Sequence, residues 1–320
     1  MAKSLTDKMV IGVSSRALFD LSAENHIFET EGTESYCRYQ VEHENDVLKP
    51  GPGFELIRSL LTLNQVKPGR ELVEVIVMSR NSPDTSLRVF NAIRHYGLPI
   101  TRAVLASGAS LAPYLNAFHT DLFLSACEDD VQSAVDSGIA GGIICTEHVM
   151  KVKAFPDAQR EPARIRIAFD GDAVLFTDES EQIFQEKGLK AFEENESNMA
   201  KTPLQEGPFA NFLRKLSDLQ RELGVEDCPI RTALVTARSA PAHERVIRTL
   251  RAWNVRVDEA FFLGGLEKKE ILRAFGAQIF FDDQSIHTMS ASQAVPAARV
   301  PYRNRKRPLT PNEETNVKTG

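Results

Sequence analysis

An internal repeat constrains the fold of this chain more than any other feature of its sequence. Short segments of the first half recur in the second half in the same order, 156 to 158 positions later. Five matches with so little drift favour two copies of one unit over a chance likeness between two α/β segments. The repeat pairs residues 11–19 with 167–176, 51–52 with 207–208, 56–60 with 212–216, 79–83 with 237–241, and 116–118 with 273–275.

The repeat also explains the length of the chain, since 320 residues are more than one ordinary domain needs. We predict a first unit over residues 1–156 and a second over residues 157–300. The remaining residues, 301–320, contain few apolar side chains, so we predict a polar, flexible tail.

Strands and helices alternate along the second copy. Short apolar runs rich in β-forming residues predict strands at 165–169, 232–235, 260–263 and 278–281. Capping residues and apolar residues at helical spacing predict helices that begin near 178 and that cover 209–223, 241–253 and 267–275. This alternation is typical of an α/β protein with a mostly parallel, doubly wound sheet.

Charge and cysteine content exclude several classes of function. With 38 basic and 44 acidic residues the net charge is −6, so the basic excess typical of nucleic-acid-binding proteins is missing. The four cysteines form no CxxC pair, which excludes a zinc knuckle and a thioredoxin-type site. The longest apolar run, residues 138–145, is too short to span a membrane. We therefore expect a cytoplasmic protein that binds neither nucleic acid nor membrane.

Polar groups suited to phosphate chemistry follow three predicted strands of the second copy. Because ligands bind at the carboxyl ends of strands in such sheets, we expect these groups to meet there. Carboxylates alone would repel a phosphomonoester dianion, and Mg²⁺ held by carboxylate oxygens resolves that conflict. A lysine adds positive charge and a threonine hydroxyl adds a neutral donor. The residues are Asp170 and Asp172, Thr236, Asp282 and Asp283, and the lysine pair Lys268 and Lys269.

Four ordered motifs of the second copy resemble those of the haloacid dehalogenase superfamily of phosphohydrolases. They are residues 169–176, 234–239, 264–268 and 279–284. The longer strings 167–181, 229–239, 281–284 and 300–302 resemble the cytosolic 5′-nucleotidases of type I, and this resemblance runs through nearly the whole chain. Together with the repeat, it implies two tandem Rossmann-like units of haloacid-dehalogenase type. The second would carry the active site and a helical cap insertion over about 178–228.

The resemblance implies catalytic roles for three of these residues. Asp170 would attack phosphorus and form an aspartyl-phosphate, which divides one difficult displacement into two easier ones. Asp172 would protonate the leaving 5′-oxygen and then deprotonate the hydrolytic water. Lys268 would neutralise the phosphate and the Asp170 carboxylate, although its neighbour Lys269 is not excluded by sequence alone.

The resemblance also implies which residues bind phosphate and metal. Thr236, Ala237 and Arg238 would contact the phosphate, and Arg238 is equally compatible with capping the sheet edge. The Mg²⁺ ligands would be Asp170, Asp172, Asp282 and Asp283. The resemblance does not decide whether Asp282 or Asp283 contacts the metal directly. The expected reaction is the hydrolysis of nucleoside 5′-monophosphates by a homo-oligomeric enzyme. Two alternatives stay open, namely a phosphatase for sugar phosphates or other small phosphomonoesters and a nucleotide-binding regulatory protein.

The first copy lacks the catalytic residues of the second. Alignment of the copies places Ser14 at Asp170, Arg16 at Asp172, Met78 at Thr236, and Ser125 and Ala126 at Asp282 and Asp283. We therefore predict that the first copy is catalytically inactive and packs against the active one. An alternative is a metal-free anion site for a nucleotide effector, formed by Ser14, Ser15, Arg16, Ser79 and Arg80.

Overall fold

One sheet of ten strands runs through the molecule. The computed structural model describes residues 5–146, 164–224 and 228–302. The order of the strands across the sheet is β10-β9-β8-β11-β12-β7-β6-β1-β4-β5. In the first half the strands are β1 (Met9–Val13), β4 (Val73–Ser79), β5 (Arg102–Leu105), β6 (Leu122–Ser125) and β7 (Ala140–Ile144). In the second half they are β8 (Ile165–Phe169), β9 (Ile230–Thr236), β10 (Glu259–Phe262), β11 (Ile279–Asp282) and β12 (Ala297–Arg299).

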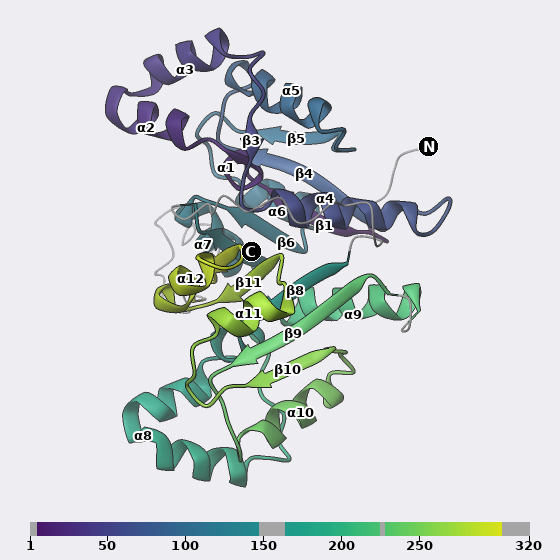
Figure 1. The fold of residues 1–320 in the computed structure, drawn as a ribbon, viewed down its shortest axis with the longest axis vertical. Helices are drawn as coiled ribbons and strands as arrows, with labels where there is room; N and C mark the ends of the chain where they lie inside the picture. The colour runs from purple at the N-terminus through teal and green to yellow at the C-terminus, as the bar shows by residue number, and fades with distance from the viewer. Residues whose placement is uncertain (1–4, 147–163, 225–227, 303–320) are drawn as a thin grey trace, which may run out of the picture.

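The two halves of the sheet have matching strand orders. Counted from the outer edge, the first half reads β5-β4-β1-β6-β7 and the second reads β10-β9-β8-β11-β12. All neighbours within a half are parallel. The halves join through β7 and β12, which pair antiparallel with Ala298 beside Ile144. The predicted mostly parallel α/β sheet is confirmed, and the halves share it rather than forming two separate sheets (Figure 1).

Helices cover both faces of the sheet because alternate strand residues point to opposite faces. In β11, for example, Ile279 and Phe281 join the core under one helical layer, while Phe280 joins the core on the other face. The first layer contains α4 (Phe54–Thr62), α5 (Leu87–His95), α9 (Ala210–Leu223) and α10 (His243–Ala252). The opposite layer contains α6 (Ala112–Ala117), α7 (Glu128–Asp136), α11 (Lys269–Phe275) and α12 (Ser285–Ser292).

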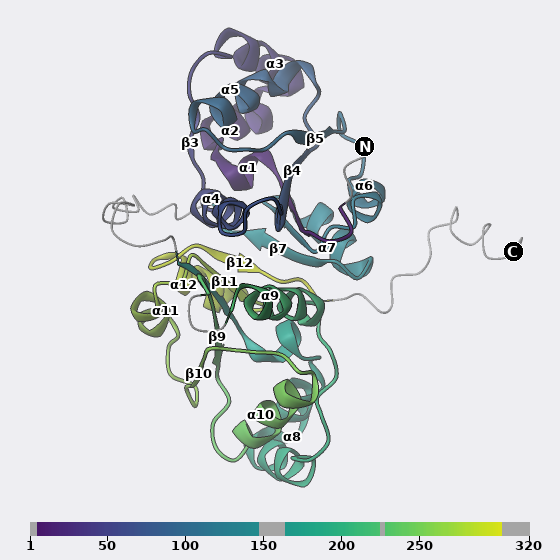
Figure 2. The ribbon, with the colours of Figure 1, turned by 90° about the vertical axis from the view of Figure 1, so that its right-hand side faces the viewer.

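Each half also carries a pair of helical segments far from the shared β7–β12 pair, at opposite ends of the molecule (Figure 2). In the first half these are α2 (Ser22–Glu31) and α3 (Thr33–Glu42), separated by Gly32 with φ 86°. In the second half α8 (Glu179–Asn198) breaks at Gly188, with φ 80°. A helical insertion is therefore not confined to the second half. Of the residues predicted as a cap, α8 occupies this outer position, whereas α9 packs into the main core.

Short elements complete the described chain. A single helical turn, α1 (Ser15–Leu18), follows β1, and β2 (Phe19–Asp20) pairs antiparallel with β3 (Lys49–Pro50). Further single turns lie at Leu63–Gln65, Asp84–Ser86 and Gly171–Leu175. The predicted boundary near 156 lies outside the described residues, as does the predicted tail beyond Tyr302. Within the described chain, no helix is long and apolar enough to cross a bilayer.

One of the sequence matches is a glycine in both halves, Gly51 and Gly207, and the structure shows why no larger residue fits there. A Cβ at Gly51 would lie 2.8 Å from the backbone carbon of Phe19, and one at Gly207 would lie 2.3 Å from the carbonyl oxygen of Phe176. Both are closer than real Cβ contacts, so only glycine lets the chain pass this strand-to-helix turn. The turn leads into α4 in the first half and into α9 in the second, and both helices pack into the same core. They lie near the middle of the molecule in Figure 2.

Candidate active site

The carboxyl ends of β8, β9 and β11 form the site. These three strands are neighbours in the order β9-β8-β11, so residues that follow them are close in space although up to 112 positions apart in sequence. Asp170 follows β8, Thr236 ends β9, and Asp282 ends β11. The backbone N–H of Asp170 donates to the carbonyl of Phe281 over 2.8 Å, which fixes Asp170 beside β11.

Lys268 joins two of these strand ends. Its ammonium donates to Asp170 Oδ1 over 2.8 Å and to Asp282 Oδ2 over 2.6 Å, and all three side chains are buried. Lys268 immediately precedes α11, which carries it to the edge of the sheet. The structure also distinguishes the two lysines that the sequence left open. Lys269, which is only half-buried, instead donates to Gln293.

Asp170, Asp282 and Asp283 form a buried cluster of carboxylates. One oxygen from each lies within 4.8 Å of the others, a grouping that can hold a metal ion. Lys268 bonds to two of these carboxylates, and Asp283 accepts from the neutral hydroxyl of Tyr302, so the three carboxylates together outnumber the one lysine. Three convergent carboxylate oxygens are the ligands that a hard divalent cation prefers. The residues present therefore fit a divalent metal.

Burial and neighbouring charges shift the pKa values of this cluster in different directions. Burial raises the pKa of Asp170, and Lys268 offsets this only in part. Burial also raises the pKa of Asp283 to about 6. At Asp282, the His287 ring, whose Nδ1 lies 3.3 Å from Oδ2, and the Lys268 ammonium outweigh burial and lower the pKa. Two carboxyls are thus strained as anions in the metal-free protein, which a bound cation would relieve.

Asp283 has a partner that the sequence did not indicate. The hydroxyl of Tyr302 donates to Asp283 Oδ2 over 2.6 Å, and the carbonyl of the same tyrosine accepts from Gln132 Nε2 over 2.9 Å. Gln132 lies on α7, so the first half touches the residue that orients Asp283. The string at 300–302 already resembled the family, but only the fold brings its tyrosine to the site.

Thr236 lies against the loop that follows Asp170. Its hydroxyl is buried, and a Cβ at Gly171 would lie 3.3 Å from Oγ1, so glycine leaves room for the threonine there. Oγ1 accepts a hydrogen bond from the backbone N–H of Arg238 over 3.2 Å, and its own proton is available to a phosphoryl oxygen. Ala237, between these residues, is exposed directly after β9.

Arg238 faces acids rather than an open phosphate site. Its Nε and Nη2 donate to the two oxygens of Asp172 over 2.8 and 2.6 Å, and its Nη1 donates to Glu196 over 2.5 Å. The side chain is only 2% exposed. Phosphate binding by Arg238 would require one of these bonds to break. Asp172 also lies outside the carboxylate cluster, because both its oxygens accept from Arg238.

The residues around Arg238 include two that the sequence did not single out. Glu196 on α8 is fully buried and accepts from Arg245 Nη1 on α10 over 2.8 Å, and from the hydroxyl of Ser180 over 2.9 Å. These bonds and Arg238 outweigh burial and lower the pKa of Glu196. In sequence, a glutamate on a highly charged helix reads as a solvated residue. Its burial depends on contacts with arginines 42 and 49 positions away, which no local pattern indicates.

The strand registers correct one correspondence between the copies. Val13 pairs with Val77 in the first half, and Phe169 pairs with Leu234 in the second. Thr236 therefore matches Ser79, and its assignment to Met78 is wrong by one position. The loops after these strands align at an offset of 158, whereas the strands themselves align at 157. Ser79 retains a hydroxyl, which accepts from Asn81 N over 3.1 Å as Thr236 does from Arg238 N.

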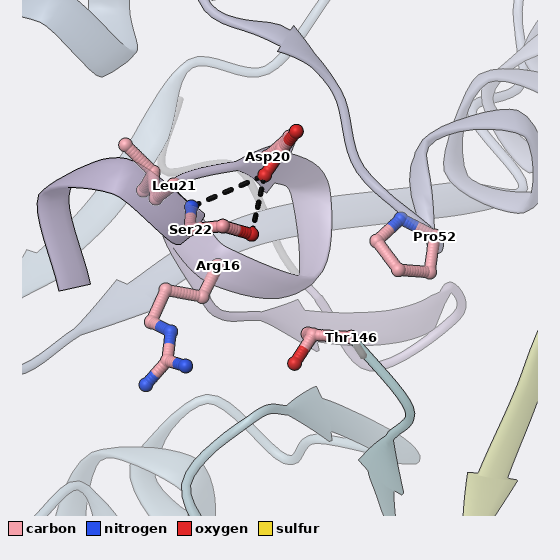
Figure 3. Close-up of a pocket in the computed structure, with 6 residues that line it drawn as sticks. All are labelled: Arg16, Asp20, Leu21, Ser22, Pro52 and Thr146. Atoms are coloured by element: carbon pink, nitrogen blue, oxygen red, sulfur yellow. Dashed lines mark hydrogen bonds between the residues drawn. The ribbon is translucent and has the colours of Figure 1, made fainter. Parts of the chain in front are cut away.

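The structure brings two residues of the predicted anion site in the first half together, since the hydroxyls of Ser15 and Ser79 lie 3.2 Å apart. Arg80 is held by Asp130 through three hydrogen bonds of 2.7 to 3.0 Å, and Ser14 Oγ accepts from Ala17 N over 3.2 Å. Arg16 lines a small pocket together with Asp20, whose carboxylate accepts hydrogen bonds from Ser22 (Figure 3). The rest of that lining is Leu21, Pro52 and Thr146. A nucleotide effector site in this half stays a prediction.

Comparisons with known proteins agree with the site. A sequence model of the family described as 5′-nucleotidase matches residues 1–307. The human (Homo sapiens) protein named cytosolic 5′-nucleotidase 1B is 39% identical over 295 residues, which cover 89% of this chain and 47% of that protein. The chain thus spans about half the length of this curated relative. A solved structure titled "Structure of Pnkp1/Rnl/Hen1 complex" covers 94% of this chain and 98% of its own at 13% identity, but with a TM-score of 0.31 it supports no argument.

Proposed function

The chain belongs to the 5′-nucleotidase family, and on that premise we propose that it hydrolyses nucleoside 5′-monophosphates to nucleoside and phosphate. One observation carries the proposal. Asp170, Lys268 and Asp282 converge at the carboxyl ends of neighbouring strands, in hydrogen-bonding distance and shielded from water. A buried carboxylate nucleophile beside a fixed cation is the arrangement that phosphoryl transfer requires.

The nucleophile in this proposal is Asp170. One carboxylate oxygen of Asp170 attacks phosphorus, and the bond between phosphorus and the 5′-oxygen breaks, which leaves an aspartyl-phosphate. Lys268 holds Oδ1 and compensates charge on the carboxylate and on the phosphoryl oxygens. The hydroxyl of Thr236 donates to a phosphoryl oxygen. Water then attacks the phosphorus, phosphate leaves, and the carboxylate of Asp170 is restored.

Asp172 moves the protons in both steps. It gives a proton to the leaving 5′-oxygen in the first step and takes one from the attacking water in the second. Asp172 lies two residues after the nucleophile, and Ala173, with φ 59°, turns the chain directly after it. The side chain is then held by Arg238 beside the site.

We assign Mg²⁺ as the metal, held by Asp170, Asp282 and Asp283. The donor set is all oxygen and the negative charge of the cluster is in excess, which supports a hard divalent cation. When bound, the ion supplies positive charge for the phosphate dianion and for the carboxylate that approaches it. Asp172 stays a predicted ligand that its ion pair with Arg238 does not favour.

The matching strand orders, glycines and helix pairs support a further proposal, that the halves are two copies of one unit of haloacid-dehalogenase type. We place the catalytic unit in the second half, with α8 as its cap, because the carboxylate cluster lies there. The cytosolic 5′-nucleotidase among its relatives supports a cytosolic location.

A panel of substrates tests the proposed activity. Phosphate release is measured from the four common nucleoside 5′-monophosphates and from several sugar phosphates, with Mg²⁺ or with EDTA. We expect Mg²⁺-dependent turnover that is fastest with a nucleotide. A preference for sugar phosphates would instead support the rival phosphatase, and binding of nucleotides without turnover would support a regulatory protein. Turnover that resists EDTA would contradict the metal.

A further inference from the structure

Four charged side chains, three of them buried, form an ion chain that connects α8 and α10 with Asp172. The ion chain consists of Asp172, Arg238, Glu196 and Arg245. Arg238 donates to Asp172 through Nε and Nη2 and to Glu196 through Nη1, and Arg245 donates to Glu196 from the other side. The side chains of Arg238, Glu196 and Arg245 are at most 3% exposed. Water therefore cannot replace any of these partners at low cost.

Arg238 is fixed from the side of α8. Its guanidinium lies 5.3 Å from the centre of the Phe192 ring, on the same helix as Glu196. A rotation of Arg238 away from Glu196 would leave a buried carboxylate with one arginine instead of two, at a cost in free energy. The orientation of Asp172 is thus determined by α8 through Arg238, because both Asp172 oxygens accept from this one guanidinium.

The first half contains the same helix pair with a different placement of the acid. Arg88 matches Arg245, and each donates through Nε to a backbone carbonyl, that of Asp46 over 2.9 Å or that of Thr202 over 3.0 Å. The acid that pairs with Arg88 is Glu24, over 2.5 Å.

Glu24 does not match Glu196. It lies 156 positions before Ser180, and the residue 156 positions before Glu196 is Gln40. At the place of Arg238 the strand alignment puts Asn81, whereas the loop alignment puts Arg80, which pairs with Asp130 rather than with an acid of the helix pair. The helix pair therefore needs an acid for its arginine, but that acid need not occupy the position of Glu196. Among the described residues, the half that has Arg238 and Asp172 is the half in which the acid occupies the position of Glu196.

We propose that Glu196 is a positioning residue, which holds Arg238 so that Asp172 is aimed at the leaving oxygen. The proposal rests on the proposed function, since it concerns the proton transfers of that reaction. General acid catalysis needs the donor within hydrogen-bond reach of the reacting oxygen, so a small displacement of Asp172 slows it. Glu196 touches no reacting atom in this account and acts only through Arg238.

The leaving group distinguishes positioning of Asp172 from a general structural role. A nucleoside 5′-oxygen is a poor leaving group that needs a proton, whereas p-nitrophenolate leaves without one. We therefore measure release of the alcohol in the first turnover, from p-nitrophenyl phosphate and from the nucleoside 5′-monophosphate that the wild type hydrolyses fastest. For Glu196→Gln we expect a loss of about tenfold or more with the nucleotide, and a change of less than about twofold with p-nitrophenyl phosphate.

Two further variants serve as matched controls. Glu24→Gln removes the buried acid that pairs with Arg88 in the first half, far from Asp172. We expect this variant to leave both rates unchanged. The double variant Ser180→Glu with Glu196→Gln copies the arrangement of the first half, with an acid for Arg245 but none for Arg238. It is expected to fold, and to keep the selective loss with the nucleotide.

Each outcome decides the proposal. An equal loss with both esters, a full nucleotide rate in Glu196→Gln, or recovery of that rate in the double variant would overturn it, because the role of Glu196 would then be structural. If the wild type hydrolyses nucleotides and any of these results is found, the positioning role alone is refuted. A wild type that hydrolyses neither ester refutes the proposed function and, with it, the positioning of Asp172.

Discussion

The ammonium of Lys268 lies 2.8 Å from Asp170 Oδ1, although the two residues are 98 positions apart in the sequence. Lys268 donates equally closely to Asp282, so a single buried cation serves carboxylates at the ends of two neighbouring strands. Asp282 and Asp170 are held by one lysine and are grouped with Asp283, so the three carboxylates lie where we propose that a phosphoryl group and a metal bind. The predictions below follow from these contacts and from the ion chain.

Replacement of the nucleophile should abolish turnover without unfolding the protein. Asp170→Asn keeps the size of the side chain and removes one negative charge from the cluster of three carboxylates. We expect phosphate release to fall on the order of 10⁴-fold, with the unfolding midpoint in urea unchanged or higher. Retained activity in a folded variant would remove the nucleophile assignment.

Loss of Lys268 should reduce both stability and activity. Lys268→Met leaves buried carboxylates without their cation, and the free energy of unfolding should fall by about 3–5 kcal/mol in metal-free protein. Lys269→Met is the matched control, because the neighbouring lysine is only half-buried and contacts Gln293 rather than a carboxylate. We expect it to change stability by less than about 0.5 kcal/mol. Equal effects in the two variants, measured by urea denaturation, would contradict the distinction between them.

The hydroxyl of Thr236 should matter more than its methyl group. Thr236→Val removes the donor to the phosphoryl group and the acceptor for Arg238 N, and we expect kcat/KM to fall by about 10²-fold. Thr236→Ser keeps the hydroxyl and should stay within about tenfold of the wild type. If steady-state kinetics rank the two variants in the opposite order, Thr236 packs rather than binds.

The ion chain should make stability depend on acid pH. Arg238, Ser180 and Arg245 hold the pKa of Glu196 below its ordinary value of 4.5 in the folded protein. A lowered folded pKa means that Glu196 stabilises the fold above that ordinary value and loses this contribution as pH falls through its folded pKa. At pH 7, Glu196→Gln should cost about 3–5 kcal/mol. Urea denaturation should show a smaller cost below pH 4.5, and a cost that grows there would contradict the lowered pKa.

Local sequence signals predicted the strands that carry the site well. The strand at 165–169 is observed with those bounds, and Asp170, Thr236 and Asp282 lie at strand ends as expected. Periodicity and turn residues suffice for this because a parallel sheet brings the carboxyl ends of its strands together. The predicted helix start near 178 is also found, although Asp178 makes no side-chain cap bond.

What the sequence could not provide are contacts between residues far apart. Arg238 and Glu196 are 42 positions apart, and neither charge alone indicates that both are buried. The hydrogen bond from Tyr302 to Asp283 depends on the last strand being beside β7 of the other half. The single shared sheet was not predicted for the same reason. Two copies that form separate sheets and two copies that share one sheet have the same local sequence pattern.

The central claim is that Asp170 carries the phosphoryl group during turnover, and trapping it is the most direct test. The wild-type protein with Mg²⁺ is mixed with excess nucleoside 5′-monophosphate and quenched in acid within the first turnovers, and its peptides are analysed by mass spectrometry. We predict a peptide that contains Asp170 and carries one phosphoryl group, absent in Asp170→Asn. Rapid consumption of the nucleotide with no phosphorylated peptide, or with the phosphoryl group on another residue, would contradict the account.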